Sequence, residues 1–309
     1  MRTRLLTLAI AVGIGLTTVS PSNAATSRIA VHFDLTKGQQ PENIALSPDG
    51  TAYVTFATAR QVAEISPKGT IRILATLPAP AEGGAPALGF ALTAGIVRTA
   101  DGTLYFLYAS GDPATTGLYR LRPGGKPQRI AALPANGLPN GLAYDEPAKT
   151  FYLTDSVLGS ISTVPLHGGH ARVWSSAPEL AAAGFLGANG IKVRHGAIWA
   201  TNLDRGTLLR IPIRQRRPGP VQVKATGLVG IDDIAFTGDG DDQVIAALNA
   251  PNKVVRIDTD GRAVTLLTAE LQNPTSVAVR DRTLYVLNAA YLTATDPNLT
   301  LATIGESHA

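Results

Sequence analysis

The sequence Ile-Ala-Leu-Ser-Pro-Asp-Gly-Thr-Ala-Tyr at residues 44–53 returns at residues 96–105 as Ile-Val-Arg-Thr-Ala-Asp-Gly-Thr-Leu-Tyr. Four weaker copies follow, and the phrase recurs every 43 to 52 residues, with the later copies beginning at Leu142, Ile191, Ile234 and Val277. Each copy reads as two short alternating strands joined by a tight turn, for which Asp-Gly is a strong local signal. Six copies of one hairpin therefore dominate the organisation of the chain.

Further strands are expected after the hairpins. A third strand is predicted at residues 62–65, 117–121, 206–211 and 253–257, and a fourth at residues 71–74, 170–174 and 263–267. Four antiparallel strands that recur at this interval are typical of a β-propeller. We therefore predict an all-β fold, a six-bladed β-propeller formed by a single domain over residues 25–309. A β-sandwich of the same strands would explain the alternation but not the repeat.

The two ends of the predicted domain indicate how the ring closes. Residues 29–35 read as a strand that precedes the first copy, and residues 299–304 are the only plausible strand after the last hairpin. If the N-terminal strand forms the outer edge of the last blade, the ring is closed and its edges are protected.

The first residues read as a targeting segment rather than as part of the fold. A basic start with Arg2 and Arg4 precedes an apolar run at residues 5–16, and small residues flank Ala24. These features predict a secretory signal peptide at residues 1–24 and a secreted or periplasmic protein. A membrane anchor is the alternative, but the run is short for a bilayer. No other segment is apolar enough to span a membrane.

Composition excludes several classes of partner and site. Without Arg2 and Arg4, 25 of the 27 basic residues face 23 acidic ones, and this balance gives no argument for nucleic acid binding. Cysteine is absent, so neither disulfides nor thiolate metal sites are possible. The sequence carries no signal for an oligomeric state.

One position in each copy is expected to face the central channel, because the first strand of a propeller blade lines it. Two residues before the first apolar position of each copy stand Glu42, Ala94, Asn140, Asn189, Asp232 and Thr275. Buried carboxylates that face each other need a cation, and this ring offers no Lys or Arg. Oxygen ligands suit Ca²⁺, whereas the lack of His and Cys disfavours zinc and copper.

We therefore predict a site for Ca²⁺, or for another divalent cation, with the ligands Glu42, Asn140, Asn189 and Asp232. Turn chemistry is the alternative interpretation for the two Asn-Gly pairs. The ends of the second strands return to the same face and carry further polar residues. With Thr275, these residues are predicted to support the ligands or bind substrate, and turn capping is their alternative role: Asp155, Asn202, Asn249 and Asn288.

With these residues placed, the chain resembles the senescence-marker-protein/gluconolactonase family, the regucalcin-like lactonases, over residues 30–288. More distantly it is similar to paraoxonases and diisopropyl fluorophosphatase. The resemblance implies a channel-bound Ca²⁺ held by Glu42 in Pro-Glu-Asn, by Asn140 and Asn189 before Gly, and by Asp232 in Ile-Asp-Asp-Ile. The chain departs from the family pattern around Glu42 and Asp232, and no His stands where paraoxonases carry a catalytic one.

The resemblance implies metal-dependent hydrolysis of a small-molecule ester or lactone. A metal can polarise the carbonyl and lower the pKa of a bound water, and Asp232 is the expected general base or nucleophile. Residues 78–90 and 178–186 are candidate lids or plain connections. Two alternative hypotheses for the function are a non-catalytic metal-stabilised ligand-binding propeller and a strictosidine-synthase-like propeller.

Overall fold

The computed structural model describes residues 27–81, 83–238, 240 and 242–305. The predicted signal peptide at residues 1–24 lies outside the described residues. Among the residues that are described, no helix has both the length and the apolar character needed to cross a membrane.

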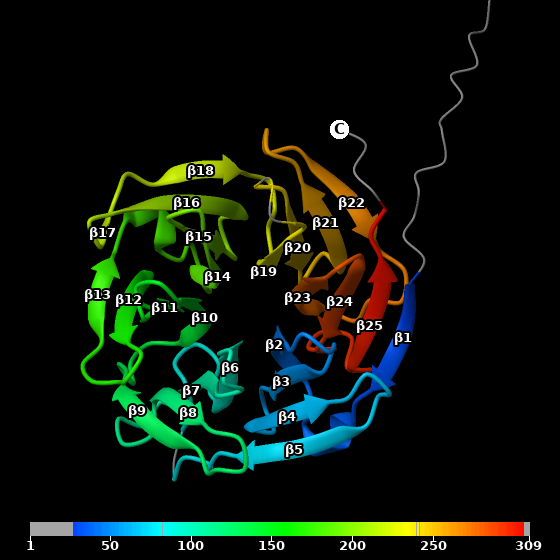
Figure 1. The fold of residues 1–309 in the computed structure, drawn as a ribbon, viewed down its shortest axis with the longest axis horizontal. Coiled ribbons are helices and arrows are strands. Elements are labelled where there is room, and N and C mark those ends of the chain that lie inside the picture. The colour runs from blue at the N-terminus through cyan, green and yellow to red at the C-terminus, as the bar shows by residue number, and fades with distance from the viewer. Residues whose placement is uncertain (1–26, 82, 239, 241, 306–309) are drawn as a thin grey trace, which may run out of the picture.

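Six antiparallel sheets are arranged around one axis, as Figure 1 shows, and the predicted six-bladed β-propeller is confirmed. Blade 1 consists of β2 (Pro41–Leu46), β3 (Ala52–Phe56), β4 (Gln61–Ile65) and β5 (Ile71–Thr76). Blade 2 consists of β6 (Leu92–Arg98), β7 (Leu104–Ala109), β8 (Gly117–Leu121) and β9 (Gln128–Ala132). Blade 3 consists of β10 (Pro139–Asp145), β11 (Thr150–Asp155), β12 (Ser160–Pro165) and β13 (Arg172–Ser175).

The second half of the ring follows the same plan. Blade 4 consists of β14 (Ala188–Arg194), β15 (Ala197–Asn202), β16 (Thr207–Arg214) and β18 (Gln222–Ala225), with the short β17 (Arg217–Pro218) paired to the end of β16. Blade 5 consists of β19 (Ile231–Phe236), β20 (Val244–Leu248), β21 (Lys253–Ile257) and β22 (Ala263–Leu267). Blade 6 consists of β23 (Pro274–Arg280), β24 (Thr283–Asn288), β25 (Asn298–Thr303) and β1 (Ser27–His32).

Blade 6 closes the ring with both ends of the domain. Its strands lie in the order β1-β25-β24-β23, so the N-terminal strand is the outer edge, as predicted. The expected strand at residues 29–35 is too long at its C-terminal end. Asp34 accepts a hydrogen bond from the backbone N–H of Thr36 at 3.0 Å and caps a single 3-10 turn, η1 (Leu35–Lys37). A side chain that captures the backbone in this way ends the strand.

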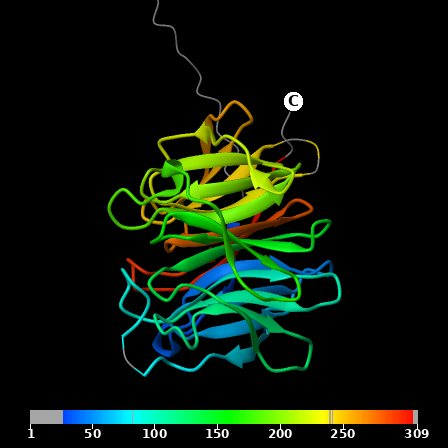
Figure 2. The same ribbon diagram turned by 90° about the vertical axis from the view of Figure 1, so that its left-hand side faces the viewer.

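The hydrophobic core lies between the blades. Each of six clusters of buried apolar residues joins two neighbouring blades, for example Ile96 and Phe106 of blade 2 with Val62 of blade 1. Both faces of a middle strand are therefore covered, and all of β7 is buried. The edge-on view in Figure 2 shows the sheets packed on one another in this way.

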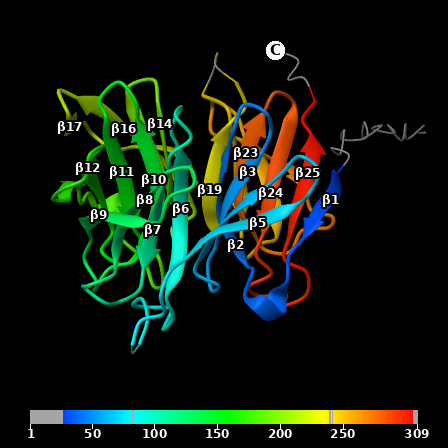
Figure 3. The ribbon, with the colours of Figure 1, turned by 60° about the horizontal axis from the view of Figure 1, so that its bottom comes forward.

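One end of the channel gathers the connections that matter for function. Each inner strand begins at this end, and residues 77–81 and 83–91, which belong to the connection between blades 1 and 2, lie there. In Figure 3 this connection, in cyan, and the red connection between β24 and β25 extend from the same side of the ring. The second candidate lid, at residues 178–186, contains the short helical turn η2 (Pro178–Leu180).

Candidate functional site

A β-bulge lies at each of the six channel-facing positions. In every inner strand the pairing register shifts at this position, and in blades 1, 3 and 5 the shifts surround Glu42, Asn140 and Asp232. A bulge leaves a residue unpaired and turns its side chain away from the regular pleat. The repeat thus places six equivalent side chains at one end of the channel.

Threonines of the second strands fix two of these bulges. Thr201 Oγ1 accepts a hydrogen bond from the backbone N–H of Gly190 at 2.8 Å and donates to the carbonyl of Asp232 at 2.8 Å. Thr154 makes the same two bonds, to Gly141 N–H and to the carbonyl of Asn189. Each hydroxyl therefore ties the bulge of its own blade to the channel-facing residue of the next blade.

The glycine after each Asn allows this close approach. A Cβ atom on Gly190 would lie 2.5 Å from the carbonyl oxygen of Asp232, and one on Gly141 would lie 2.3 Å from that of Asn189. Both distances are shorter than any real contact, so a larger residue would push the blades apart. The Asn-Gly pairs serve the packing of inner strands here, rather than the turns that were their alternative interpretation.

Four of the six channel-facing residues line one pocket. Glu42, Asn140, Asn189 and Asp232 border a cavity of about 320 Å³, together with Asn249 and Tyr291. Each of the four is at most 8 % exposed. Two carboxylates and two carboxamides from four blades are thus brought together, although they lie far apart in the sequence.

The remaining two ring positions contribute no ligand atom to this pocket. Ala94 is fully buried and has no polar side-chain atom. Thr275 is also fully buried, and its hydroxyl donates to the carbonyl of Pro41 at 2.9 Å. Thr275 therefore joins blade 6 to blade 1.

The pocket destabilises its own negative charges. Burial raises the pKa of Glu42 to about 7, the charge of Asp233 adds to this, and a hydrogen bond from Tyr291 acts in the opposite direction. Burial, followed by the charges of Glu42 and Asp233, raises the pKa of Asp232 well above its ordinary value, against a hydrogen bond from Asn249. Low-dielectric surroundings and like charges both favour the protonated acids.

Tyr291 is a site residue that the sequence did not indicate. Its hydroxyl donates to Glu42 Oε2 at 2.5 Å. Burial and the charge of Glu42 raise the pKa of Tyr291 well above its ordinary value, so the phenol keeps the proton with which it binds Glu42. Tyr291 lies in the connection between β24 and β25, outside the repeated unit, and the repeat therefore gave no signal for it.

The two adjacent acids of blade 5 face different surroundings. Asp232 lines the pocket, whereas Asp233 Oδ1 pairs with Lys192 Nζ at 2.6 Å. Asp233 Oδ2 accepts further hydrogen bonds from Ser276 at 2.6 Å and Asn43 at 3.2 Å. Asp233 is therefore a compensated charge that ties blades 1, 4, 5 and 6 together, and Asp232 is the acid of the pocket.

The second-strand residues divide into two groups. Asn249 lines the pocket and bonds to Asp232. Asp155 instead accepts from the backbone N–H groups of Leu138, Val157 and Leu158. Asn202 binds the carbonyls of Glu179 and Ala181, and Asn288 binds Gln272, Asn298 and Thr300. The bonds of Asp155, Asn202 and Asn288 are those of the alternative role, the support of turns and connections.

The donor set of the pocket fits a hard divalent cation. Ser156 Oγ donates to the carbonyl of Ala188 at 2.7 Å and accepts from Asn140 Nδ2 at 3.2 Å, so Asn140 Oδ1 is left for another partner. Within the described residues, the Asn189 side chain makes no hydrogen bond. Oxygen atoms of Glu42 and Asp232 complete a set that Ca²⁺ prefers, and two carboxylates balance its charge.

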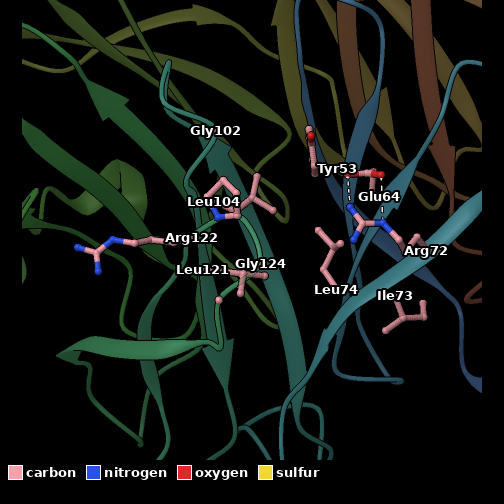
Figure 4. A pocket seen from close by; sticks show the side chains of 12 residues that line it. Tyr53, Glu64, Arg72, Ile73, Leu74, Gly102, Leu104, Leu121, Arg122 and Gly124 are labelled. Atoms are coloured by element: carbon pink, nitrogen blue, oxygen red, sulfur yellow. Dashed lines mark hydrogen bonds and ion pairs between the residues drawn. The ribbon is translucent and has the colours of Figure 1, made fainter.

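The other clusters and cavities are weaker candidates for a functional site. In the part of the chain that the structure describes, no group of three or more His, Cys, Asp or Glu side chains is placed to hold a metal. A cavity of about 270 Å³ between blades 1 and 2 is shown in Figure 4. There Arg72 is paired with Glu64 at 2.8 Å, and the side chain of Arg122 extends away from that pair. The charges of Arg72 and Glu64 thus compensate each other, and the charge of Arg122 lies away from them.

No protein-family model matches the chain, and no curated protein matches its sequence. Many solved structures do share its fold. The calcium-binding protein regucalcin from Agrobacterium tumefaciens is 18 % identical, with a TM-score of 0.66 over 90 % of this chain and 93 % of that one.

A presumed gluconolactonase is 15 % identical, with a TM-score of 0.65 over 93 % of this chain and 96 % of that one. A virginiamycin B lyase from Staphylococcus aureus, crystallised as a catalytically inactive variant with quinupristin, is 16 % identical, with a TM-score of 0.62 over 87 % of this chain and 82 % of that one. These likenesses show the fold alone. Because a calcium-binding protein, a presumed gluconolactonase and a lyase share this fold, the function has to be argued from the pocket.

Proposed function

We propose that this propeller binds a divalent cation, Ca²⁺ in the first place, through Glu42, Asn140, Asn189 and Asp232, and hydrolyses an ester or lactone in the same pocket. One observation carries the proposal: two buried carboxylates and two carboxamides line one cavity whose described residues include no basic side chain. Such a cavity is electrostatically unfavourable when empty and becomes favourable with a cation. The calcium-binding neighbour regucalcin shares the fold and supports the choice of metal.

A bound cation would supply polarisation of the substrate carbonyl and stabilisation of the negative charge that develops on its oxygen. The chain supplies the remaining functions. Water adds to the carbonyl carbon, the bond from that carbon to the ester oxygen breaks, and the proton lost by the water ends on the leaving oxygen. Asp232 is our general base for the water, because its carboxylate lines the same cavity as Glu42, Asn140 and Asn189 and would lie beside a water held there.

Tyr291 and Asn249 hold the two acids in place. The Tyr291 hydroxyl binds one oxygen of Glu42 and leaves the other for the cation. The Asn249 side chain likewise forms a hydrogen bond with the Asp232 carboxylate. Groups locked by such supporting bonds lose little entropy when a ligand arrives.

A non-catalytic propeller, in which the ion only joins the blades, is the competing function. The two are separated by assaying a panel of aryl esters and lactones with the purified protein, in Ca²⁺ and in EDTA. We expect hydrolysis that requires the metal and that falls by at least about a hundredfold in Asp232→Asn, since a general base contributes on that scale. Metal content measured on the same samples shows whether the variant still binds the ion.

Glu146→Gln is the matched control, because this acid is 67 % exposed and lies outside the pocket. Its activity should equal that of the unmodified protein. If Ca²⁺ raises the melting temperature while no ester or lactone is hydrolysed, the ion has a structural role only. If Ca²⁺ neither binds nor stabilises the protein, the whole proposal is wrong.

A further inference from the structure

The wall of the pocket is apolar above the four oxygen residues. Eight of its lining side chains are leucine or phenylalanine, and they come from five separate stretches of chain outside the channel-facing ring. Leu88 and Phe90 come from the connection between blades 1 and 2. Phe185 and Leu186 come from the connection between blades 3 and 4. Residues that resemble each other chemically have therefore been gathered from different loops into one surface.

Exposure separates the floor of the pocket from its mouth. The four oxygen residues are buried, whereas Phe90 is 38 %, Phe185 51 % and Leu292 68 % exposed. Among the described residues, nine large apolar side chains are exposed, and three of them border this one pocket. Large apolar groups left in water around a concave site mark a surface that is covered by a ligand.

The polar groups of the pocket are confined to its floor. Besides the four oxygen residues, only Asn249 and Tyr291 are polar among the lining residues that the structure describes, and both are already bonded to the acids of the floor. The hydroxyl groups of a sugar lactone would meet the leucine and phenylalanine wall without partners, and a buried hydroxyl without a partner weakens binding. An alkyl or aryl group would instead gain from burial against the same wall.

We infer that the site takes esters or lactones that carry an apolar alkyl or aryl group, and that it disfavours polyhydroxylated sugar lactones. This inference rests on the proposed hydrolysis for the identity of the reacting group. The cavity of about 320 Å³ has room for about ten groups the size of a water molecule, which fits a medium-chain lactone. The reacting carbonyl lies at the oxygen-lined floor, and the apolar group extends to Phe90, Phe185 and Leu292.

A matched pair of substrates tests the inference. δ-Decalactone and glucono-δ-lactone have the same ring and the same number of non-hydrogen atoms, but the first carries an alkyl chain and the second hydroxyl groups. In Ca²⁺, and corrected for spontaneous hydrolysis, we expect kcat/KM for δ-decalactone to be at least about tenfold higher. In a series of shorter δ-lactones, each added methylene should raise kcat/KM about three- to fourfold until the chain fills the pocket.

Phe185→Ser and Leu292→Ser report on the wall. Both side chains are exposed, so the variants should fold, and both should lower kcat/KM for δ-decalactone more than for glucono-δ-lactone, mainly through KM. Leu158→Ser is the matched control, because Leu158 is 42 % exposed but does not line the pocket. A preference for glucono-δ-lactone, or equal losses for both lactones in the two wall variants, overturns the inference.

The inference can also be judged if hydrolysis fails altogether. Calorimetric titration of δ-decalactone into the Ca²⁺-loaded protein then measures binding directly. Binding that is lost in Phe185→Ser but kept in Leu158→Ser would preserve the apolar ligand class while the proposed hydrolysis falls. An absence of binding and of hydrolysis with δ-decalactone would refute the inference, whereas the proposed hydrolysis is decided by the panel of esters and lactones.

Discussion

Replacing Glu42 by glutamine is expected to stabilise the metal-free protein at pH 8 and to remove most of its stabilisation by Ca²⁺. The two effects have one cause. The Glu42 carboxylate is buried at 8 % exposure in a pocket that also holds Asp232, so its charge is costly without a cation and useful with one. Glutamine keeps the shape of the protonated acid and an oxygen to which Tyr291 can donate.

The pKa of Glu42 sets the size of the effect. Its pKa is about 7 in the folded protein, against an ordinary value of 4.5. Between these values the folded protein holds a proton that the unfolded chain has released, so the stability present below pH 4.5 is lost as the pH rises through 7. The difference corresponds to about 3 kcal/mol at pH 8. Glu42→Gln should recover about this amount in EDTA and almost nothing at pH 4.5.

Urea unfolding at pH 4.5 and pH 8, in EDTA and in millimolar Ca²⁺, measures both parts of this prediction. Glu146→Gln is again the control, because it removes an exposed charge and should leave all four free energies of unfolding unchanged. A Glu42→Gln variant that is no more stable than the unmodified protein in EDTA at pH 8 would contradict the prediction. Equal stabilisation of the variant and the unmodified protein by Ca²⁺ would contradict it as well, because Glu42 would then not be a ligand.

Three further substitutions test the surroundings of the site. Tyr291→Phe removes the hydroxyl that donates to Glu42 and should weaken Ca²⁺ binding about tenfold by calorimetry, and an unchanged affinity would contradict its positioning role. Lys192→Met leaves the buried Asp233 carboxylate without its cation and should cost about 2 kcal/mol in urea unfolding, which Asp233→Asn in the same chain should partly restore. Gly190→Ala places a Cβ atom 2.5 Å from the carbonyl oxygen of Asp232 and should cost about 2 kcal/mol or more, whereas Gly184→Ala, with open space around it, should cost little; equal costs would contradict the packing argument.

The fold could be predicted from the sequence because its signals are local. The Asp-Gly turns at residues 49–50 and 101–102 use the short-range chemistry of hairpins, with Gly50 and Gly102 at φ of 88° and 82°. Closure by the N-terminal strand followed from counting strands. The end of that strand was predicted wrongly, because the bonds that the Asp34 side chain makes to Thr36 and Lys37 outweigh the strand pattern beyond His32.

The position two residues before the first apolar residue of each copy predicted the pocket residues Glu42, Asn140, Asn189 and Asp232. It did so because the bulge lies at the same place in every blade. The position at the end of each second strand does not distinguish the residue that lines the pocket from those that do not. Asp155, Asn202 and Asn288 are the last residues of their strands, whereas Asn249 follows the end of β20 by one residue. Successive side chains of a strand point to opposite sides. A shift of one residue therefore changes the side to which a side chain points, and the shift at Asn249 arises because β20 ends one residue earlier, at Leu248.

The apolar wall could not be predicted from the sequence. Its residues Leu88, Phe90, Phe185 and Leu292 come from connections without the repeat, and only the closed ring brings these connections to one end of the channel. A pattern based on the repeated unit can locate the residues that every blade shares. It has no information about loops that differ from blade to blade, and these loops are where substrate preference is expected to arise.

The adjacent acids Asp232 and Asp233 explain why the missing charge has to come from outside the protein. Lys192 of β14 is bound to Asp233 at 2.6 Å, so this cation is already paired and does not line the pocket. Asp232 and Glu42 are left facing each other with only neutral donors, Asn249 and Tyr291, among the described residues that line the pocket. Neutral hydrogen bonds offset part of the cost of burying two like charges, and the pKa of each acid remains raised in spite of them. At neutral pH the pocket is therefore favoured by protons or by a cation, and the cation affinity that we propose for it should depend on pH.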